Sequence, residues 1–274
     1  MFKDKYGPWA LIIGGSEGMG RCMAIRLAKE GLNLALVARK RGPLEEAVTE
    51  LKALNKGDVR GLSQDMTAPD MMDHIKDFTK DIDVGLLVYN AGAMDRFTTF
   101  LGDNIEGHLH TIRRNCDGPT RLSHHFGRLM RDRRRGGLIL MSSVSGLAGS
   151  YGVPVYGASK AFDMILAEGL WAEFREFGVS VLSAVVGSVA TPANARMFLG
   201  NQPEGLIDAD TAAQEVLANL ENGPTLFMSN VKKMVEFLRN GDRQQAVGQL
   251  ADLTKTYFAR GANNAPFDPT AIVK

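Results

Sequence analysis

A glycine-rich turn between an apolar run and a helical pattern is the feature that most constrains the fold of this chain. The run Trp9-Ala10-Leu11-Ile12-Ile13 is typical of a buried strand. It leads into Gly14-Gly15-Ser16-Glu17-Gly18-Met19-Gly20, and apolar residues then recur at helical spacing until Gly31, which can close the helix in a left-handed cap. A dinucleotide-binding fold needs a strand, a glycine turn and a helix in this order. The glycines that would serve the tight turn, the approach of backbone to a pyrophosphate and the close packing of the helix are Gly14, Gly18 and Gly20.

The rest of the chain repeats the alternation of short β-rich runs with longer helical patterns. Strands are predicted near 9–14, 33–38, 59–63, 83–89, 137–142, 179–186 and 224–228. Helices fill the gaps, the long ones near 104–131 and 154–177, and two polar helices follow near 230–239 and 242–258. This order predicts right-handed βαβ units and therefore an α/β, doubly wound Rossmann fold with a seven-stranded parallel sheet and a C-terminal helical extension. We expect residues 1–274 to form a single domain, with a loose tail at 261–266.

Composition limits the classes of partner. The net charge of +1 and the 45% hydrophobic content of the 274 residues predict a globular core and no overall field for nucleic acid or an anionic membrane. The basic run 131–135 is expected to be a solvated loop rather than a phosphate patch, and Cys22 and Cys116 to be reduced core residues of a cytosolic protein. No segment approaches the ~18 apolar residues of a membrane span, and the first residues lack a secretory signal. A cytoplasmic protein is expected.

Three residues form a candidate catalytic group. Tyr156 and Lys160 are four residues apart, so a helix would place the phenol and the ammonium on one face, and Ser143 lies thirteen residues before Tyr156. A free tyrosine titrates near pH ~10, too high for proton transfer at neutral pH, and a neighbouring ammonium favours the phenolate. The pair could therefore act as a general acid or base. An ordinary amphipathic helix can carry the same pair, so the spacing alone leaves both interpretations open.

Together with the glycine turn and Asn90-Ala91-Gly92, this group resembles the short-chain dehydrogenase/reductase family over residues 9–228. The resemblance implies hydride transfer between a nicotinamide cofactor and a carbonyl or alcohol. Tyr156 would protonate the carbonyl oxygen, Lys160 would stabilise the phenolate and hold the nicotinamide ribose, and Ser143 would donate to the developing oxyanion. Ser142 is the nearest rival of Ser143. Asn115 resembles the helical asparagine that holds a water linked to Lys160, although an asparagine there could also kink or cap the helix.

The same resemblance implies a cofactor site at the carboxyl edge of the sheet. Its expected residues are Gly14, Ser16, Glu17, Gly18, Met19, Gly20, Arg39, Asp65, Met66, Asn90, Ala91, Gly92, Tyr156, Lys160, Gly187, Val189 and Thr191. Arg39, after Ala38 at the end of the second strand, would favour a ribose 2′-phosphate, so NADP(H) is preferred and NAD(H) is not excluded. Glu17 weakens that preference, because many NADP-dependent relatives carry a basic residue in this turn.

Other positions in this site admit a second interpretation or depart from the family pattern. Asp65 would receive the adenine amino group, or else cap a helix. Asn90-Ala91-Gly92 could equally be a simple turn. Val186 and Ile13 replace the proline and the threonine that the family usually carries at these positions.

The substrate is expected to be a lipophilic carbonyl or alcohol, such as a steroid or a 3-oxoacyl compound. The resemblance places a mobile lid at 191–207, and Met197, Phe198 and Leu199 make its centre apolar, either to contact a substrate or to pack the lid onto the body. The residues expected to rim the same pocket are Met94, Phe97, Leu147, Tyr151 and Val153.

Two further questions stay open in the sequence. A cofactor-binding regulatory or scaffold protein without turnover is the alternative to an enzyme, although such a protein needs no activated phenol. The long helices near 104–131 and 154–177 are expected to pair with their copies in a homodimer or homotetramer, with Trp171 and Phe174 either at the interface or in the monomer core. The spacing of the histidines predicts no metal site.

Overall fold

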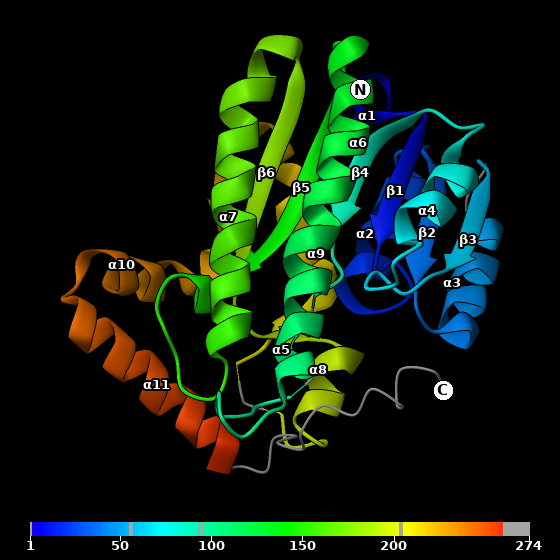
Figure 1. The fold of residues 1–274 in the computed structure, drawn as a ribbon. Helices are drawn as coiled ribbons and strands as arrows, with labels where there is room; N and C mark the ends of the chain where they lie inside the picture. Colours follow the sequence, from blue (N-terminus) through cyan, green and yellow to red (C-terminus); the bar gives the residue numbers. More distant parts are fainter. Residues whose placement is uncertain (1, 55–56, 93, 95, 203–204, 260–274) are drawn as a thin grey trace.

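A seven-stranded parallel sheet forms the centre of the molecule (Figure 1). The computed structural model describes residues 2–54, 57–92, 94, 96–202 and 205–259. The strand order is β3-β2-β1-β4-β5-β6-β9, as a doubly wound fold requires. The bounds are β1 Trp9–Ile13, β2 Asn33–Ala38, β3 Val59–Ser63, β4 Val84–Tyr89, β5 Gly136–Ser143, β6 Val179–Val186 and β9 Thr225–Phe227. The predicted fold class and the seven predicted strands are confirmed.

Helices cover both faces of the sheet, so its central strands are apolar on both sides. In β1, Ala10 and Ile12 join one core cluster, whereas Leu11 and Ile13 join the other. The first face carries α2 Gly18–Lys29, α3 Arg41–Leu54 and α9 Ala209–Ala218. The second carries α4 Met71–Thr79, α6 Gly118–Asp132 and α7 Pro154–Phe174. Because the crossovers connect parallel strands, the carboxyl ends of the strands all meet at one edge.

The first long helix is interrupted where the sequence predicted continuity. Helix α5 Ile105–Ile112 passes through a π-helical turn, Arg113–Asp117, before it continues as α6. A π-helical turn inserts extra backbone into a helix and often marks a functional position. Here the insertion contains Asn115, whose side chain is fully buried. The second long helix, α7, follows the prediction and ends in a short 3₁₀ turn, Arg175–Phe177.

Several elements lie outside the main sheet. Strands β7 Val189–Ala190 and β8 Ile207–Asp208 form a small parallel pair that flanks α8 Pro192–Met197. The C-terminal extension forms α10 Lys232–Asn240 and α11 Arg243–Ala259, and a short α1, Phe2–Tyr6, precedes β1. The expected loose tail at 261–266 lies outside the described residues. Within the described ranges, no helix combines the length and the apolar character needed to cross a membrane.

Two minor predictions hold only in part. The basic run leaves α6 for a turn in which Arg134 is exposed, as expected, but Arg133 pairs with Asp83 and donates to the Val84 carbonyl, and Arg135 donates to the Asp4 carbonyl at 3.1 Å. These arginines fasten the amino edge of the sheet, because carbonyl and carboxylate acceptors gather there. The two cysteines are free thiols, but they are half-buried rather than core residues. Cys22 lies beside the buried stripe of α2 rather than in it.

Candidate active site

A cavity of about 750 Å³ opens at the carboxyl ends of the central strands. Its volume lies within the range of about 300–1,000 Å³ that is usual for ligand pockets. With two exceptions, every residue expected for catalysis or cofactor binding lines it. The exceptions are Gly20 and Asn115, which lie directly behind the wall. The cavity therefore brings together residues from position 14 to position 191 of the chain, as the topology of a doubly wound sheet predicts.

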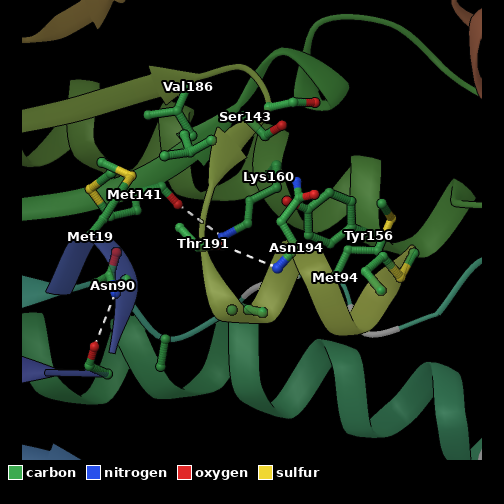
Figure 2. Close-up of a pocket in the computed structure, with 18 of the residues that line it drawn as sticks. Met19, Asn90, Met94, Met141, Ser143, Tyr156, Lys160, Val186, Thr191 and Asn194 are labelled. Carbon is green, nitrogen blue, oxygen red and sulfur yellow. Dashed lines mark hydrogen bonds between the residues drawn. The ribbon is translucent and has the colours of Figure 1, made fainter. Parts of the chain in front are cut away.

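The candidate catalytic side chains meet at one wall of this cavity, where Ser143 at the end of β5 faces the start of α7 (Figure 2). The Ser143 Oγ accepts from the Ser145 amide at 3.2 Å, which leaves its own proton available for a ligand. The rival Ser142 is occupied, because its Oγ donates to the Lys160 carbonyl at 2.6 Å. The Lys160 ammonium lies 5.9 Å from the centre of the Tyr156 ring. The hydroxyl of Ser143, the phenol of Tyr156 and the ammonium of Lys160 thus line the same cavity.

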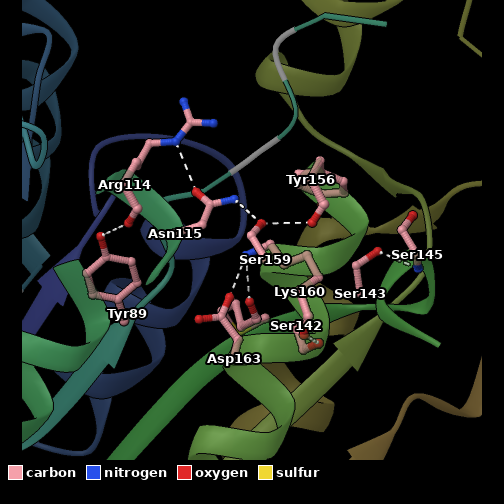
Figure 3. Close-up of polar contacts among 11 residues, drawn as sticks. Tyr89, Arg114, Asn115, Ser142, Ser143, Ser145, Tyr156, Ser159, Lys160 and Asp163 are labelled. Atoms are coloured by element: carbon pink, nitrogen blue, oxygen red, sulfur yellow. Dashed lines mark hydrogen bonds and ion pairs between the residues drawn. The ribbon is translucent and has the colours of Figure 1, made fainter. Parts of the chain in front are cut away.

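The Lys160 side chain is almost completely buried. Its Nζ donates to the Met141 carbonyl at 2.9 Å and to Asp163 Oδ2 at 3.0 Å (Figure 3). Burial raises the pKa of the Asp163 carboxyl, and the Lys160 ammonium opposes that shift. A Cβ placed on Gly92 would lie 3.0 Å from this Nζ, so only glycine leaves the ammonium open toward the cavity at that point.

Asn115 connects the π-helical turn to α7. Its Nδ2 donates to Ser159 Oγ at 2.9 Å, and Ser159 Oγ donates to the Tyr156 carbonyl at 2.7 Å. Its Oδ1 accepts from the Arg114 Nε at 3.1 Å. The side chain therefore links the first turn of α7, which carries Tyr156, to the π-helical turn in which Asn115 itself lies (Figure 3).

The glycine turn has the close contacts that a phosphate-binding turn requires. A Cβ on Gly20 would lie 2.0 Å from the Gly14 carbonyl oxygen, which explains why Gly20 packs behind the cavity wall. Gly18 has a φ of 55°, in the left-handed region that glycine adopts without strain. Asn90 Nδ2 donates to the Gly14 carbonyl at 3.1 Å and so joins the end of β4 to the turn. The turn is held open beside the N-terminus of α2, where unpaired amides favour an anion.

The far end of the cavity suits an adenosine. Asp65 Oδ1 accepts from the Thr67 amide at 2.8 Å, as a local cap would, whereas the buried Oδ2 has no partner within the described residues. An unpaired buried acceptor is costly, and an amino group of a ligand would satisfy it. The exposed Arg39 lines the same end and is followed by Lys40, a second cation that the sequence analysis did not single out. This end of the cavity therefore offers one buried acceptor without a partner among the described residues and two exposed cations.

The lid helix α8 lies against the glycine turn. The Thr191 Oγ1 accepts from the Asn194 amide at 3.1 Å and begins the helix, while its hydroxyl proton stays available. Arg196 forms an ion pair with Glu17, so the acidic residue in the turn is already matched by a cation from the lid. Met197 and Phe198 are buried against Phe97 and Tyr257, whereas Leu199 points outward and is 66% exposed. Residues 203–204 of the expected lid lie outside the described residues.

The predicted rim is correct for three residues and wrong for two. Met94, Phe97 and Val153 line the cavity. Leu147 does not, because it packs into the main core, and its carbonyl accepts from Arg243 at 2.7 Å. Tyr151 does not either, because it lies edge-on to Phe258 at the surface.

Helix α11 lines the cavity with side chains that the sequence analysis missed. These are Leu250, Leu253, Thr254 and Tyr257. Their spacing, which begins one turn earlier at the buried Ala246, is the helical period of an amphipathic helix, so the signal was present in a segment described only as polar. His110 and Arg114 also line the cavity, and His108 is buried with its Nε2 2.9 Å from the Phe100 carbonyl oxygen. Within the described part of the chain, no group of three or more histidine, cysteine or carboxylate side chains could hold a metal ion.

Comparison with known proteins agrees with this geometry. The model of the short chain dehydrogenase family matches residues 8–201. A 7beta-hydroxysteroid dehydrogenase of Mediterraneibacter gnavus is 32% identical over 203 residues, which cover 74% of this chain and 75% of the relative. A very-long-chain 3-oxoacyl-CoA reductase of Bos taurus is 30% identical over 193 residues, with coverages of 68% and 60%.

Solved structures share the fold. One, described in a study of 7beta-hydroxysteroid dehydrogenase stereoselectivity, superimposes with a TM-score of 0.83 at 23% identity and covers 91% of this chain and 98% of that one. A short-chain dehydrogenase from Sphingobium yanoikuyae in complex with NADPH has a TM-score of 0.73 at 26% identity, with coverages of 80% and 86%.

Proposed function

Since this chain belongs to the short-chain dehydrogenase/reductase family, we propose that it is an NADP(H)-dependent oxidoreductase that interconverts a lipophilic ketone and its secondary alcohol. The observation that carries the proposal is that Ser143, Tyr156 and Lys160 line one cavity together with an apolar cluster, against which the Tyr156 ring packs. A bound nicotinamide would supply or accept the hydride. The whole dinucleotide would be held by the glycine turn, Asn90-Ala91-Gly92, Lys160, Gly187 and Thr191.

Residues of this chain transfer the proton and stabilise the charge that develops during the reaction. In the direction of reduction, Tyr156 donates its phenolic proton to the carbonyl oxygen, and Ser143 donates a hydrogen bond to the same oxygen as charge develops on it. Lys160 stabilises the phenolate that remains. Asn115 holds the helical turn that carries Tyr156, through Ser159. The free proton on Ser143 and the occupied hydroxyl of Ser142 support this division of roles.

The apolar wall supports a lipophilic substrate. Phe97, Val153, Met197 and Phe198 form a buried cluster to which Met94 and Tyr257 add further apolar area. Aromatic and methionine side chains contribute contact area without fixing a particular hydrogen-bond pattern, which suits a large apolar ring system or an acyl chain. The names of the relatives, a hydroxysteroid dehydrogenase and a 3-oxoacyl-CoA reductase, point to the same two substrate classes.

The preference for NADP(H) rests on the charge around the expected ribose position. Arg39 and Lys40 line that end of the cavity, and Ala38 stands where a carboxylate would repel a 2′-phosphate. Glu17, the residue that weakened the prediction, is paired with Arg196 and so adds less net negative charge to the turn. A relative crystallised with NADPH supports the same assignment.

Two measurements test the proposal. Fluorescence titration with NADPH and with NADH should show tighter binding of NADPH. A turnover screen should include a steroid ketone, a 3-oxoacyl thioester and, as a control, a small polar ketone, and we expect turnover of at least one lipophilic compound at a much higher kcat/KM than the control. Tight cofactor binding without turnover of any carbonyl or alcohol would favour a regulatory or scaffold protein instead.

A further inference from the structure

Lys160 has a carboxylate partner for which the proposed chemistry has no use. Asp163 follows Lys160 by one helical turn, and its Oδ2 lies 3.0 Å from the Lys160 Nζ. The two side chains are only 2% and 5% exposed, so water screens the pair little. Together with the Met141 carbonyl, this carboxylate occupies two of the three donors of the ammonium. The remaining donor is the one that a ligand in the cavity could use.

Among the groups around Asp163, Lys160 is the cation that balances its charge. Its second oxygen, Oδ1, is buried and has no hydrogen-bond partner within the described residues. The charge of Asp163 acts on Tyr89 in β4 and on Cys116 in the π-helical turn. Burial, with the charge of Asp163, raises the pKa of Tyr89 and raises that of Cys116 to about 11, so both groups stay neutral near pH 7. Arg114 and Asp117, in the same π-helical turn, act on Tyr89 with opposite signs.

We propose that Asp163 is a positioning residue of this active site. Its carboxylate fixes the Lys160 ammonium against the end of β5, and its negative charge limits the stabilisation that this ammonium gives to a Tyr156 phenolate. The inference rests on the proposed function, because it concerns the proton-transfer pair of that site.

The electrostatic part follows from the order of the groups along α7. Residues 156, 160 and 163 occupy one face of the helix, so a phenol, an ammonium and a carboxylate follow one another (Figure 3). A phenolate and a carboxylate repel each other. In a buried site this repulsion is screened little, so it offsets part of the attraction between the phenolate and the ammonium that lies between them.

The test is the replacement Asp163→Asn, which removes the charge and leaves an amide oxygen that can still accept from Lys160. The ionisation of Tyr156 is read from the ultraviolet absorbance of phenolate, as the difference between the protein and its Tyr156→Phe form, each with and without Asp163→Asn. We expect the midpoint to fall by about one pH unit, the effect of one charge acting across a buried helical turn. The acid limb of the kcat profile for alcohol oxidation should fall with it.

Control variants separate this role from a merely structural one. Glu168→Gln removes a carboxylate from the same helix, where it accepts from Thr225 Oγ1 at 2.7 Å, and should leave the Tyr156 midpoint unchanged. Asp163→Glu keeps the charge and should stay close to the native midpoint. Circular dichroism establishes that each variant is folded, and Asp163→Ser replaces Asp163→Asn if that variant is not.

The possible results decide the proposal in either direction. An unchanged or raised midpoint in a folded, neutral variant overturns it, even if turnover falls. Since the phenolate titration needs no substrate, it also separates this inference from the proposed function. A protein without turnover in which the midpoint still falls would disprove the function and keep the role of Asp163.

Discussion

Tyr156 is the residue on which the proposed chemistry depends, because its phenol lines the cavity beside the Lys160 ammonium. Replacing it with phenylalanine keeps the ring and removes the proton. We expect turnover to fall by a factor of ~10² to 10⁴ or more, with cofactor affinity largely retained. Tyr151→Phe is the matched control, since Tyr151 lies outside the cavity, and it should keep its rate. A Tyr156→Phe variant with a near-native kcat would show that another group is the acid.

Arg39 carries the prediction about the choice of cofactor. Its removal in Arg39→Ala should weaken NADPH binding by about 1–3 kcal/mol, the range of a charge-assisted hydrogen bond, and leave NADH binding nearly unchanged. Arg41 is the control, because it is exposed, pairs with Glu45 and does not line the cavity. Titration of both cofactors against both variants measures the effect. Equal losses for NADPH and NADH would contradict the assignment of Arg39 to the 2′-phosphate.

At the scale of single residues, the sequence predicted those site residues that are recognised by short spacings along the chain. The pair Tyr156 and Lys160 and the rule that selects Ser143 both depend on short distances along the chain, and the structure places all three at one wall. The partners Asp163 and Arg196 were missed for different reasons. Asp163 is near in sequence, but nothing in its spacing shows that it is buried. Arg196 meets Glu17 only because distant segments fold together.

Helix α11 is the element whose role depends most on tertiary structure. Tyr257 packs against Phe198 with ring centroids 5.3 Å apart and faces the cavity. Because burying an aromatic side chain is worth about 1.5–3 kcal/mol, we expect Tyr257→Ala to raise KM for a bulky lipophilic ketone by about tenfold or more. NADPH binding should be unchanged. The measurement is KM for the ketone beside the dissociation constant of the cofactor.

The neighbouring aromatic residue supplies the control for α11. Phe258 contacts Tyr151 and packs against the apolar cluster without lining the cavity, so Phe258→Ala should leave KM near its native value. If both variants raised KM equally, α11 would act by general packing and not as part of the substrate wall.

Elements differ in how visible they are in a sequence. The central strands β1, β2 and β4 are short apolar runs, because burial on both faces makes such runs continuous. The edge strand β3, which is buried only at Val59, was found from the alternation of strands and helices along the chain. The π-helical turn at Arg113–Asp117 leaves the helical period almost unchanged and could not be found this way. Helices α10 and α11 were found as helices, but the side chains that α11 turns toward the cavity were not recognised, because polar residues separate the apolar ones along that segment.

At the scale of the whole molecule, the structure points to other residues for the expected homodimer or homotetramer interface. Trp171 and Phe174 pack against the core of the monomer. On α7 the large exposed apolar side chains are instead Phe162 and Ile165, which are 39% and 60% exposed. Leu129 on α6 is also exposed, and α6 lies beside α7 (Figure 1). We therefore propose that this helical face pairs with its copy across a two-fold axis.

A charge placed on that face tests the assembly. Ile165→Glu should shift the protein from a dimer or tetramer toward smaller species in sedimentation velocity at micromolar concentration, because a buried unpaired carboxylate opposes association. Leu54→Glu is the control, since Leu54 is 57% exposed at the end of α3, far along the chain from this face. A native protein that is monomeric at that concentration would contradict the proposed interface and leave the catalytic residues unaffected, because all of them come from one chain.

The contribution of α11 to the cavity has a consequence for how the sequence of such a protein can change during evolution. The segment that matches the family model ends at residue 201, whereas Leu250, Thr254 and Tyr257 come from beyond it. The glycine turn and the helix with Tyr156 and Lys160 can therefore stay fixed while the last stretch of the chain drifts. In proteins built this way, substitutions in the last stretch of the chain can change the substrate, while the residues proposed for the reaction stay the same.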